Sequence, residues 1–258
     1  MLKDIIRGLE LRVVNIYKKL NKLLIIKVNL MSAFDEYAEK YDEWFMKNEK
    51  VLLSEALLVE NMLKDEKGNI LSVGCGSGLF EKILRDKGII IEDCIEPSEM
   101  GKIAEKRGLK VKKGYAESLP VSNESYDVVL FNGVIHYLKD KRKALKELHR
   151  VLKKDGRLVL CWVPGESSYG LLYRLASILG WEKLSNVSPE HPYPLEFVRE
   201  ATWPTYDEVK ELLESSNFEI IKTMQTLTKH PRYSNIEVET PLSGYDKGDY
   251  VCIKAKKK

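Results

Sequence analysis

A short apolar segment that runs into three alternate glycines constrains this chain more than any other feature. Residues 70–78 are ILSVGCGSG, and apolar side chains then recur at helical spacing over 79–84. A strand, a glycine loop and a helix in this order leave free backbone N–H groups at the helix N-terminus, and the glycines let a ligand approach the main chain. The spacing is G-x-G-x-G, and Leu79 stands where a dinucleotide-binding loop has its third glycine. The loop therefore predicts a ligand site but argues against NAD.

The rest of the chain alternates predicted strands with predicted helices. Further apolar runs lie at 89–95, 109–113, 126–131, 157–163, 218–224 and 249–255. Asp140 is a predicted helix cap, Asp155-Gly156 is a predicted turn, and Thr205 with Glu208 forms a predicted capping box. This alternation predicts an α/β fold with a doubly wound parallel sheet and right-handed crossovers.

Two segments do not fit the alternation. Residues 1–30 have an apolar helical face and a net charge of +5, whereas the whole chain has only +3. This basic arm fits an anionic membrane or a partner, packing on the domain or on a second copy, or an upstream start ahead of Met31. Residues 164–204 are too long for an ordinary connection and are rich in aromatic side chains, which predicts a lid over a site or an insertion with its own small core.

Composition narrows the class of protein further. Without its basic arm the chain is mildly acidic, which argues against a nucleic-acid binder. No apolar stretch is long enough for a membrane span, and no secretory signal is recognisable. The four cysteines (Cys75, Cys94, Cys161 and Cys252) are scattered, which indicates neither zinc nor a disulfide framework and favours a reducing cytoplasm. A single glutamine amid many Lys, Glu and Ile residues is typical of a thermophile.

With its glycine loop, the chain resembles the class I S-adenosylmethionine-dependent methyltransferases, in particular their small-molecule, methyltransferase type 11-like branch. The other blocks that carry the resemblance are FDEYAEKYDEWF at 34–45, EPS at 96–98, GYAESLP at 114–120, and the segments 126–138 and 144–160. The resemblance covers about residues 34–163. It implies a Rossmann-like seven-stranded sheet, mostly parallel with an antiparallel last strand. We therefore expect an arm at 1–33, a cofactor-binding domain at 34–163 and 205–258, and an inserted lid at 164–204.

The resemblance implies S-adenosylmethionine as cofactor and assigns it a set of residues. These cofactor-binding candidates are Tyr37, Tyr41, Gly74, Cys75, Gly76, Gly78, Glu96, Pro97, Ala116, Glu117 and Asn132. Glu96, at the end of the second predicted strand, can accept both hydrogen bonds of a ribose diol, as in NAD sites. Its alternative role is a charge beside Ser98 at a helix N-terminus.

The remaining candidates have simpler alternatives. Ala116 and Glu117 would border the adenine, although Glu117 also fits a solvated charge at a helix start. Asn132 and the glycine loop would hold the methionine part, although Asn132-Gly133 alone is a hairpin signal. Tyr37 and Tyr41 would close over the cofactor or be half-buried helix aromatics. Cys75 is interpreted as a small packing residue within the loop.

Methyl transfer requires alignment of the acceptor behind the methyl group, and a base only if the acceptor must lose a proton. His136, which follows Asn132 at the sheet edge, is the candidate catalytic base, with a structural histidine as the alternative. His191 is a weaker candidate, and no metal site is expected.

We therefore expect an S-adenosylmethionine-dependent methyltransferase that acts on a small molecule by in-line displacement. The alternatives are a membrane-associated methyltransferase for a quinone or lipid, a non-catalytic cofactor-binding protein, and an RNA or protein methyltransferase. We expect a small-molecule partner, no nucleic acid, no integral membrane insertion and a cytoplasmic location. Peripheral membrane contact and a homodimer are left open.

Overall fold

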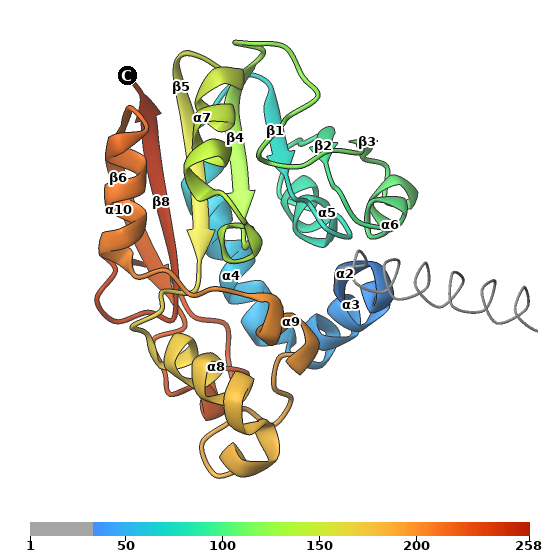
Figure 1. Ribbon diagram of the computed structural model, residues 1–258, viewed down its shortest axis with the longest axis vertical. Coiled ribbons are helices and arrows are strands. Elements are labelled where there is room, and N and C mark those ends of the chain that lie inside the picture. Colours follow the sequence, from blue (N-terminus) through green and yellow to red (C-terminus); the bar gives the residue numbers. More distant parts are fainter. Residues whose placement is uncertain (1–32) are drawn as a thin grey trace, which may run out of the picture.

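The computed structural model of the protein describes residues 33–258, so the predicted basic arm lies outside the described residues. These residues form an α/β fold around one eight-stranded sheet with the order β3-β2-β1-β4-β5-β8-β6-β7 (Figure 1). The strands are β1 (Ile70–Val73), β2 (Asp93–Ile95), β3 (Lys110–Lys112), β4 (Tyr126–Asn132), β5 (Leu152–Trp162), β6 (Phe218–Thr226), β7 (Leu242–Ser243) and β8 (Tyr250–Lys257). Strands β1 to β5 are parallel, and β8 is antiparallel to both β5 and β6.

The predicted doubly wound sheet with an antiparallel last strand is confirmed, and the predicted number of strands is one too low. The additional strand is β7, which pairs with β6 through only two residues, Leu242 and Ser243. It lies inside the long connection between β6 and β8. Two residues are too few to show the side-chain alternation that identifies a strand in a sequence.

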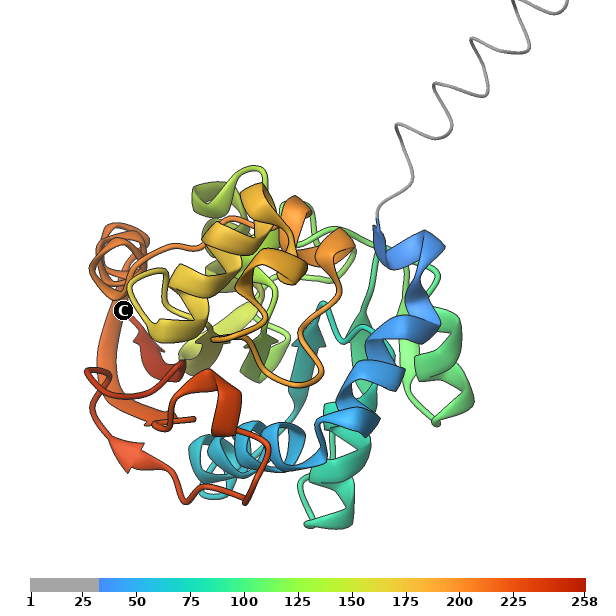
Figure 2. The same ribbon diagram turned by 90° about the horizontal axis from the view of Figure 1, so that it is seen from below.

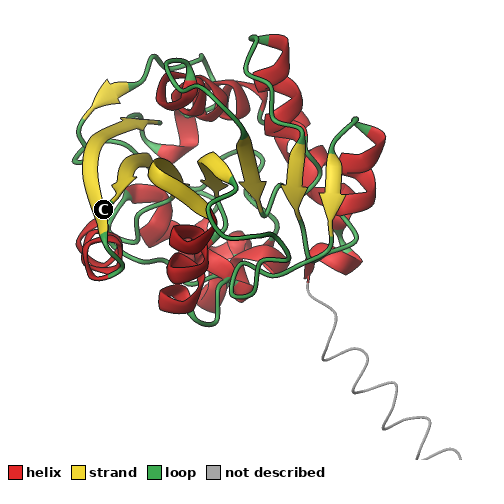
Figure 3. Cartoon of the chain, turned by 90° about the horizontal axis from the view of Figure 1, so that it is seen from above, coloured by secondary structure: helices red, strands yellow, loops and turns green. Residues whose placement is uncertain are grey.

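Helices cover both faces of this sheet (Figure 3). They are α2 (Ala33–Glu36), α3 (Ala38–Lys47), α4 (Glu49–Leu63), α5 (Leu79–Asp86), α6 (Gly101–Lys106), α7 (Lys141–Val151), α8 (Ser168–Leu179), α9 (Leu195–Glu200) and α10 (Tyr206–Ser215). Along β4, Val128 and Leu130 belong to the core shared with α3, α4, α5, α8 and α9. Val129 and Phe131 point to the other face and belong to the core shared with α7 and α10. Because successive strand residues alternate between faces, a nearly continuous apolar strand serves both cores.

Both predicted helix caps are confirmed. The Lys143 backbone N–H donates to the Asp140 carboxylate over 2.9 Å at the start of α7. At the start of α10, Thr205 and Glu208 form the reciprocal capping box, in which each side chain accepts from the backbone N–H of the other residue.

Strand β5 begins earlier than predicted. The sequence predicts a turn at Asp155-Gly156 followed by a strand over 157–163, whereas the observed strand runs from Leu152. Asp155 has the left-handed φ of 61°, and the pairing register with β4 shifts between Tyr126 and Val128. The predicted turn is therefore an irregularity within one strand, as in a β-bulge, and does not precede the strand.

The expectation of no disulfide bonds is wrong, because the structure pairs Cys75 with Cys94 and Cys161 with Cys252. Cys161 and Cys252 are register partners on the antiparallel strands β5 and β8, with Cα atoms 4.0 Å apart. Cys75 follows β1, and Cys94 lies on the neighbouring β2. Only strand pairing brings these positions together, so their spacing in the sequence gave no signal. The argument for a reducing compartment therefore loses its basis.

Residues 164–204 contain α8, a 3-10 turn (η2, Trp181–Leu184) and α9 (Figure 1 and Figure 2). Their buried aromatics, among them Tyr173, Phe197 and Trp203, belong to the same core cluster as α3 and α4. The segment therefore shares the core of the domain. Its interpretation as a lid stays a prediction.

Within residues 33–258, no helix is both long and apolar enough to cross a membrane. The same residues contain no group of three or more His, Cys, Asp or Glu side chains that could hold a metal ion.

The Thr205 cap provides a test of the fold. We expect Thr205→Ala to lower the free energy of unfolding by about 1 kcal/mol, because the Glu208 backbone N–H loses its acceptor. Thr205→Ser keeps the hydroxyl and should stay near the wild type. Urea unfolding measures both variants, and equal stabilities of Thr205→Ala and Thr205→Ser would contradict the role of the cap.

Candidate active site

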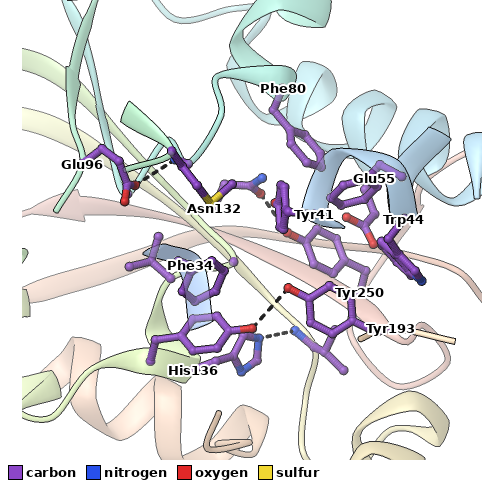
Figure 4. Close-up of a pocket in the computed structure, with 18 of the residues that line it drawn as sticks. Phe34, Tyr41, Trp44, Glu55, Phe80, Glu96, Asn132, His136, Tyr193 and Tyr250 are labelled. Carbon is purple, nitrogen blue, oxygen red and sulfur yellow. Dashed lines mark hydrogen bonds between the residues drawn. The ribbon is translucent and has the colours of Figure 1, made fainter. Parts of the chain in front are cut away.

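A pocket lies at the carboxyl ends of the parallel strands, where β1, β2 and β4 lead into loops (Figure 4). Its lining includes Gly74 and Gly76 after β1, Glu96 and Pro97 after β2, and Asn132 at the end of β4. Ligands of doubly wound sheets bind at this edge, because helix N-termini and loop backbone point there. Together with Tyr41, which also lines the pocket, six of the predicted cofactor residues thus meet in one cavity.

The glycine loop is shaped so that its backbone borders this cavity. Gly74 has a φ of +73°, and a Cβ there would come within 2.4 Å of a Val134 methyl carbon. Gly76 has a φ of +55°, and a Cβ there would lie 3.1 Å from the Met100 methyl carbon. Both positions therefore favour glycine for conformation, and Gly74 also requires it for space. The cradle fits a ligand that lies directly against the main chain.

The other two predicted loop residues serve packing and cross-linking. A Cβ at Gly78 would meet Leu109 at 2.5 Å, so this glycine lets α5 approach the start of β3. Cys75 is bonded to Cys94, and neither Cys75 nor Gly78 is among the described residues that line the pocket.

Glu96 is only 6% exposed and has three hydrogen-bond donors. One oxygen accepts from the Gly76 backbone N–H at 2.9 Å, and the other accepts from the backbone N–H and the hydroxyl of Ser98 at 2.9 and 2.5 Å. Burial raises the pKa of Glu96, and the bonds from Ser98 and Gly76 oppose that rise. The carboxylate is thus anchored between the glycine loop and the start of the next helix, and both predicted roles remain compatible with its position.

Asn132 lies in the middle of the pocket. Its side-chain oxygen accepts a 2.9 Å hydrogen bond from the Tyr250 hydroxyl, which comes from β8 (Figure 4). The alternative of a hairpin at Asn132-Gly133 is wrong, because β4 leads into a 3-10 turn (η1, Ile135–Tyr137) and α7 and pairs in parallel with both neighbours.

Four of the predicted cofactor-binding residues differ in burial and in their contacts. Tyr41 lines the pocket and is half-buried in an edge-on contact with Phe45, with ring centroids 5.0 Å apart. Tyr37 is half-buried under the Lys40 ammonium, which lies 4.1 Å from the ring centroid. Ala116 is buried, and Glu117 accepts a long 3.5 Å bond from the backbone of Asp140. Tyr37, Ala116 and Glu117 are not among the described lining residues, so their cofactor roles stay predictions.

His136 lines the pocket with both ring nitrogens engaged. Nδ1 lies 3.0 Å from the Thr202 carbonyl oxygen, and the Val163 backbone N–H approaches Nε2 at 3.2 Å. These contacts fit a neutral ring that donates from Nδ1 and accepts at Nε2. Burial lowers the pKa of His136 to about 4, which also favours the neutral form. The ring joins the end of β5 to the loop before α10. Because both of its nitrogens are used in these contacts, the ring would have to lose one of them to act as the predicted base.

Aromatic side chains form much of the rest of the pocket wall. Phe34, Tyr41, Trp44 and Phe45 come from α2 and α3, and Phe80 from α5. Tyr173, Tyr193 and Trp203 come from residues 164–204. The sequence marked residues 164–204 as rich in aromatic side chains, but only the tertiary structure places them around one cavity with the aromatic residues of α2, α3 and α5.

Glu55 is an acidic exception in this aromatic wall. It projects from α4, is 7% exposed, and has no hydrogen-bond or ion-pair partner among residues 33–258. Burial alone raises its pKa to about 8. Glu81 is also buried, but its carboxylate accepts a 2.6 Å hydrogen bond from the Ser72 hydroxyl, and it is not among the lining residues.

Comparisons with known proteins agree with this geometry. Residues 71–160 match the family described as a methyltransferase domain. The solved structure of an S-adenosylmethionine-dependent methyltransferase of Thermotoga maritima, described as a possible histamine N-methyltransferase, is 34% identical with a TM-score of 0.75, over 87% of this chain and 98% of that one. The chain belongs to the class I S-adenosylmethionine-dependent methyltransferases. The sequence-based identification is therefore confirmed.

Two further proteins are similar in sequence to this methyltransferase, and only one of them has a described activity. An uncharacterized protein of Methanocaldococcus jannaschii is 33% identical over 229 residues, 88% of this chain and 100% of the relative. The demethylmenaquinone methyltransferase of Thermotoga maritima is 33% identical over 150 residues, which are 52% of this chain and 61% of the relative.

The sequence analysis of this methyltransferase missed Glu55. The available signal was its position on α4, three residues after Leu52 and four before Val59, both of which are buried. A carboxylate on the buried face of a helix needs a partner or a function, because burial disfavours its charge.

The buried Glu55 should make the stability of this methyltransferase depend on pH. Its pKa is raised from 4.5 to about 8 in the folded chain, so the folded state holds a proton that the unfolded state has lost between these values. The contribution of Glu55 to the free energy of unfolding is therefore fully present below about pH 4.5 and is lost as the pH rises toward 8. We expect Glu55→Gln to be more stable than the wild type at pH 9, by at most about 5 kcal/mol, with little difference at pH 4.5.

Urea unfolding between pH 4.5 and 9 measures this difference. The matched control is Glu60→Gln on the same helix, outside the lining residues. The wild type and Glu55→Gln should both retain the smaller pH effects of Glu81 and Asp249, whose pKa values burial also raises. Parallel curves for the wild type and Glu55→Gln would show that Glu55 is not a buried, unpaired acid.

Proposed function

We propose that this methyltransferase transfers a methyl group to a small-molecule acceptor by in-line displacement. The observation that supports the proposal is that one pocket is lined both by the glycine loop with Glu96 and by the aromatic side chains of α3 and of residues 164–204. The first part suits the cofactor, and the second suits an organic acceptor beside it.

The residues have distinct tasks in this proposal. When bound, S-adenosylmethionine supplies a reactive methyl group on a positively charged sulfur. Glu96 accepts hydrogen bonds from the ribose hydroxyls, with Pro97 beside it, and the Gly74–Gly78 loop and Asn132 hold the methionine part. Tyr41 covers the site from α3. The aromatic faces stabilise positive charge.

Orientation is the main contribution of the protein to this reaction. Holding two reactants in line can contribute about 7–11 kcal/mol in favourable cases. The side chains that line the pocket are largely apolar and aromatic, so they exclude water and fix the orientation of the acceptor. Turnover to S-adenosylhomocysteine would distinguish the enzyme from a non-catalytic cofactor-binding protein.

A second candidate is a methyltransferase for a quinone or lipid at a membrane surface. The partial similarity to a demethylmenaquinone methyltransferase favours it, as does the basic sequence of residues 1–30. The names of two relatives thus point to different acceptors, an amine and a quinone. Cosedimentation with anionic liposomes tests this candidate, and equal partitioning of the full chain and of a chain that starts at Met31 would exclude a role for the arm.

Glu96 provides the direct test of cofactor binding. We expect Glu96→Gln to weaken S-adenosylmethionine binding by about tenfold to a hundredfold, because a charged acceptor is lost. Isothermal titration measures the dissociation constant, and the exposed neighbour Glu99→Gln is the control. Unchanged affinity of Glu96→Gln would contradict the ribose role, and a wild type that does not bind S-adenosylmethionine would overturn the proposed function.

His136 is proposed to position the backbone around the pocket. We expect His136→Leu to lower the free energy of unfolding by about 2 kcal/mol, because the Val163 N–H and the Thr202 carbonyl lose a buried partner. The shape of the pH profile of kcat should not change. A pH-dependent limb of kcat that disappears in the variant at unchanged stability would instead support the predicted general base.

A further inference from the structure

Among the described side chains that line the pocket, acidic residues have no lysine or arginine opposite them. Among residues 33–258, the lining contains two carboxylates, Glu55 and Glu96, and no lysine or arginine. The remaining titratable base, His136, is held neutral by burial and by its backbone contacts. The pocket gives no counter-charge to an anionic acceptor, and a cation bound beside Glu55 would favour the ionised form of its carboxylate.

The two carboxylates differ in their partners and in their places. Glu96 is satisfied by three donors of the chain, whereas Glu55 has none among the described residues. Figure 4 shows them on opposite sides of Asn132. Because the Glu96 side is assigned to the cofactor, Glu55 belongs to the acceptor side.

Two polar groups near Glu55 on the pocket wall donate to other residues. The Trp44 indole N–H donates to the His191 carbonyl at 2.9 Å, and the Tyr250 hydroxyl donates to Asn132. Burial raises the pKa values of Tyr41, Tyr173 and Tyr250, and the charge of the nearby Glu55 adds to that rise. The carboxylate is therefore surrounded by aromatic rings, and a bound molecule can supply the donor that it lacks.

We propose that Glu55 and the surrounding aromatic rings select an alkylammonium group as the methyl acceptor, and that Glu55 accepts its proton before the transfer. This inference rests on the proposed function. A carboxylate beside aromatic faces is the chemistry that recognises an organic cation, through a charged hydrogen bond and through cation–π attraction.

The proton transfer gives the acceptor its nucleophile. An alkylammonium nitrogen has no lone pair, so an N–H proton first passes to a Glu55 carboxylate oxygen. The freed lone pair then forms the new C–N bond while the bond between the methyl carbon and sulfur breaks, and the sulfur keeps that electron pair as a neutral thioether. The product is a methylated ammonium ion, and Glu55 returns its proton to water.

The environment of Glu55 suits both the recognition of an alkylammonium group and the acceptance of its proton. An ordinary carboxylate is a weak base toward an alkylammonium ion, whose pKa is about 10.4. The Glu55 pKa of about 8 lies much closer to that value. The facing titratable groups, Tyr41 from α3, Tyr173 from α8 and Tyr250 from β8, have raised pKa values and stay neutral, so they do not compete for the proton.

Matched amine and alcohol pairs test the selection. The probes are 2-phenylethylamine against 2-phenylethanol and butylamine against butanol, titrated into full-length protein saturated with S-adenosylhomocysteine. We expect the wild type to bind at least one amine about tenfold to a hundredfold more tightly than its alcohol. Glu55→Gln should lose this preference, whereas Glu60→Gln should keep it. With S-adenosylmethionine, release of S-adenosylhomocysteine should require the amine and should fall at least tenfold in Glu55→Gln.

The same titrations separate the two proposals. If the wild type binds S-adenosylmethionine but prefers neither amine, or if Glu55→Gln keeps the preference, the role of Glu55 is wrong and the proposed function stands. If S-adenosylmethionine itself does not bind, the proposed function fails. Thermal unfolding of Glu55→Gln provides the folding control, because the isosteric amide should leave the fold intact at neutral pH.

Discussion

The left-handed backbone of the glycine loop after β1 is the constraint on which the whole site depends. Because Gly74 carries no side chain, the loop packs directly against Val134 beyond the end of β4. Because Gly76 presents its N–H, the loop is also tied to Glu96 at the end of β2. One short segment thus joins the ends of three strands. The cofactor end of the pocket, where the loop and Glu96 meet, follows from that junction.

Three buried glutamates show how partners decide the task of one residue type. Glu96 has three donors and is an anchored acceptor at the cofactor end. Glu81 has one donor, Ser72, and lies outside the pocket lining. Glu55 has no partner among the described residues and faces the pocket. Burial raises the pKa of all three, but only an unpaired carboxylate that faces a cavity gains by binding a cation.

Local features were the ones that the sequence predicted well. The Asp140 cap and the Thr205 capping box depend on residues three apart, and the strand, glycine loop and helix at 70–79 are contiguous. The misses in strand and cysteine pairing involve distant partners. The pairing of Cys161 with Cys252 depends on the register of β5 against β8, and the two-residue β7 exists only because β6 is beside it.

The sequence by itself determined the parallel α/β sheet, the helix caps and the cofactor edge, because apolar periodicity, capping chemistry and glycine spacing act over a few residues. The tertiary structure alone decided the acceptor side. It brought Tyr41, Tyr173 and Tyr250 around Glu55 from α3, α8 and β8, and it left that carboxylate without a described partner. The physical reason is that burial and partnership belong to the packed surroundings of a side chain, which the order of the residues does not specify.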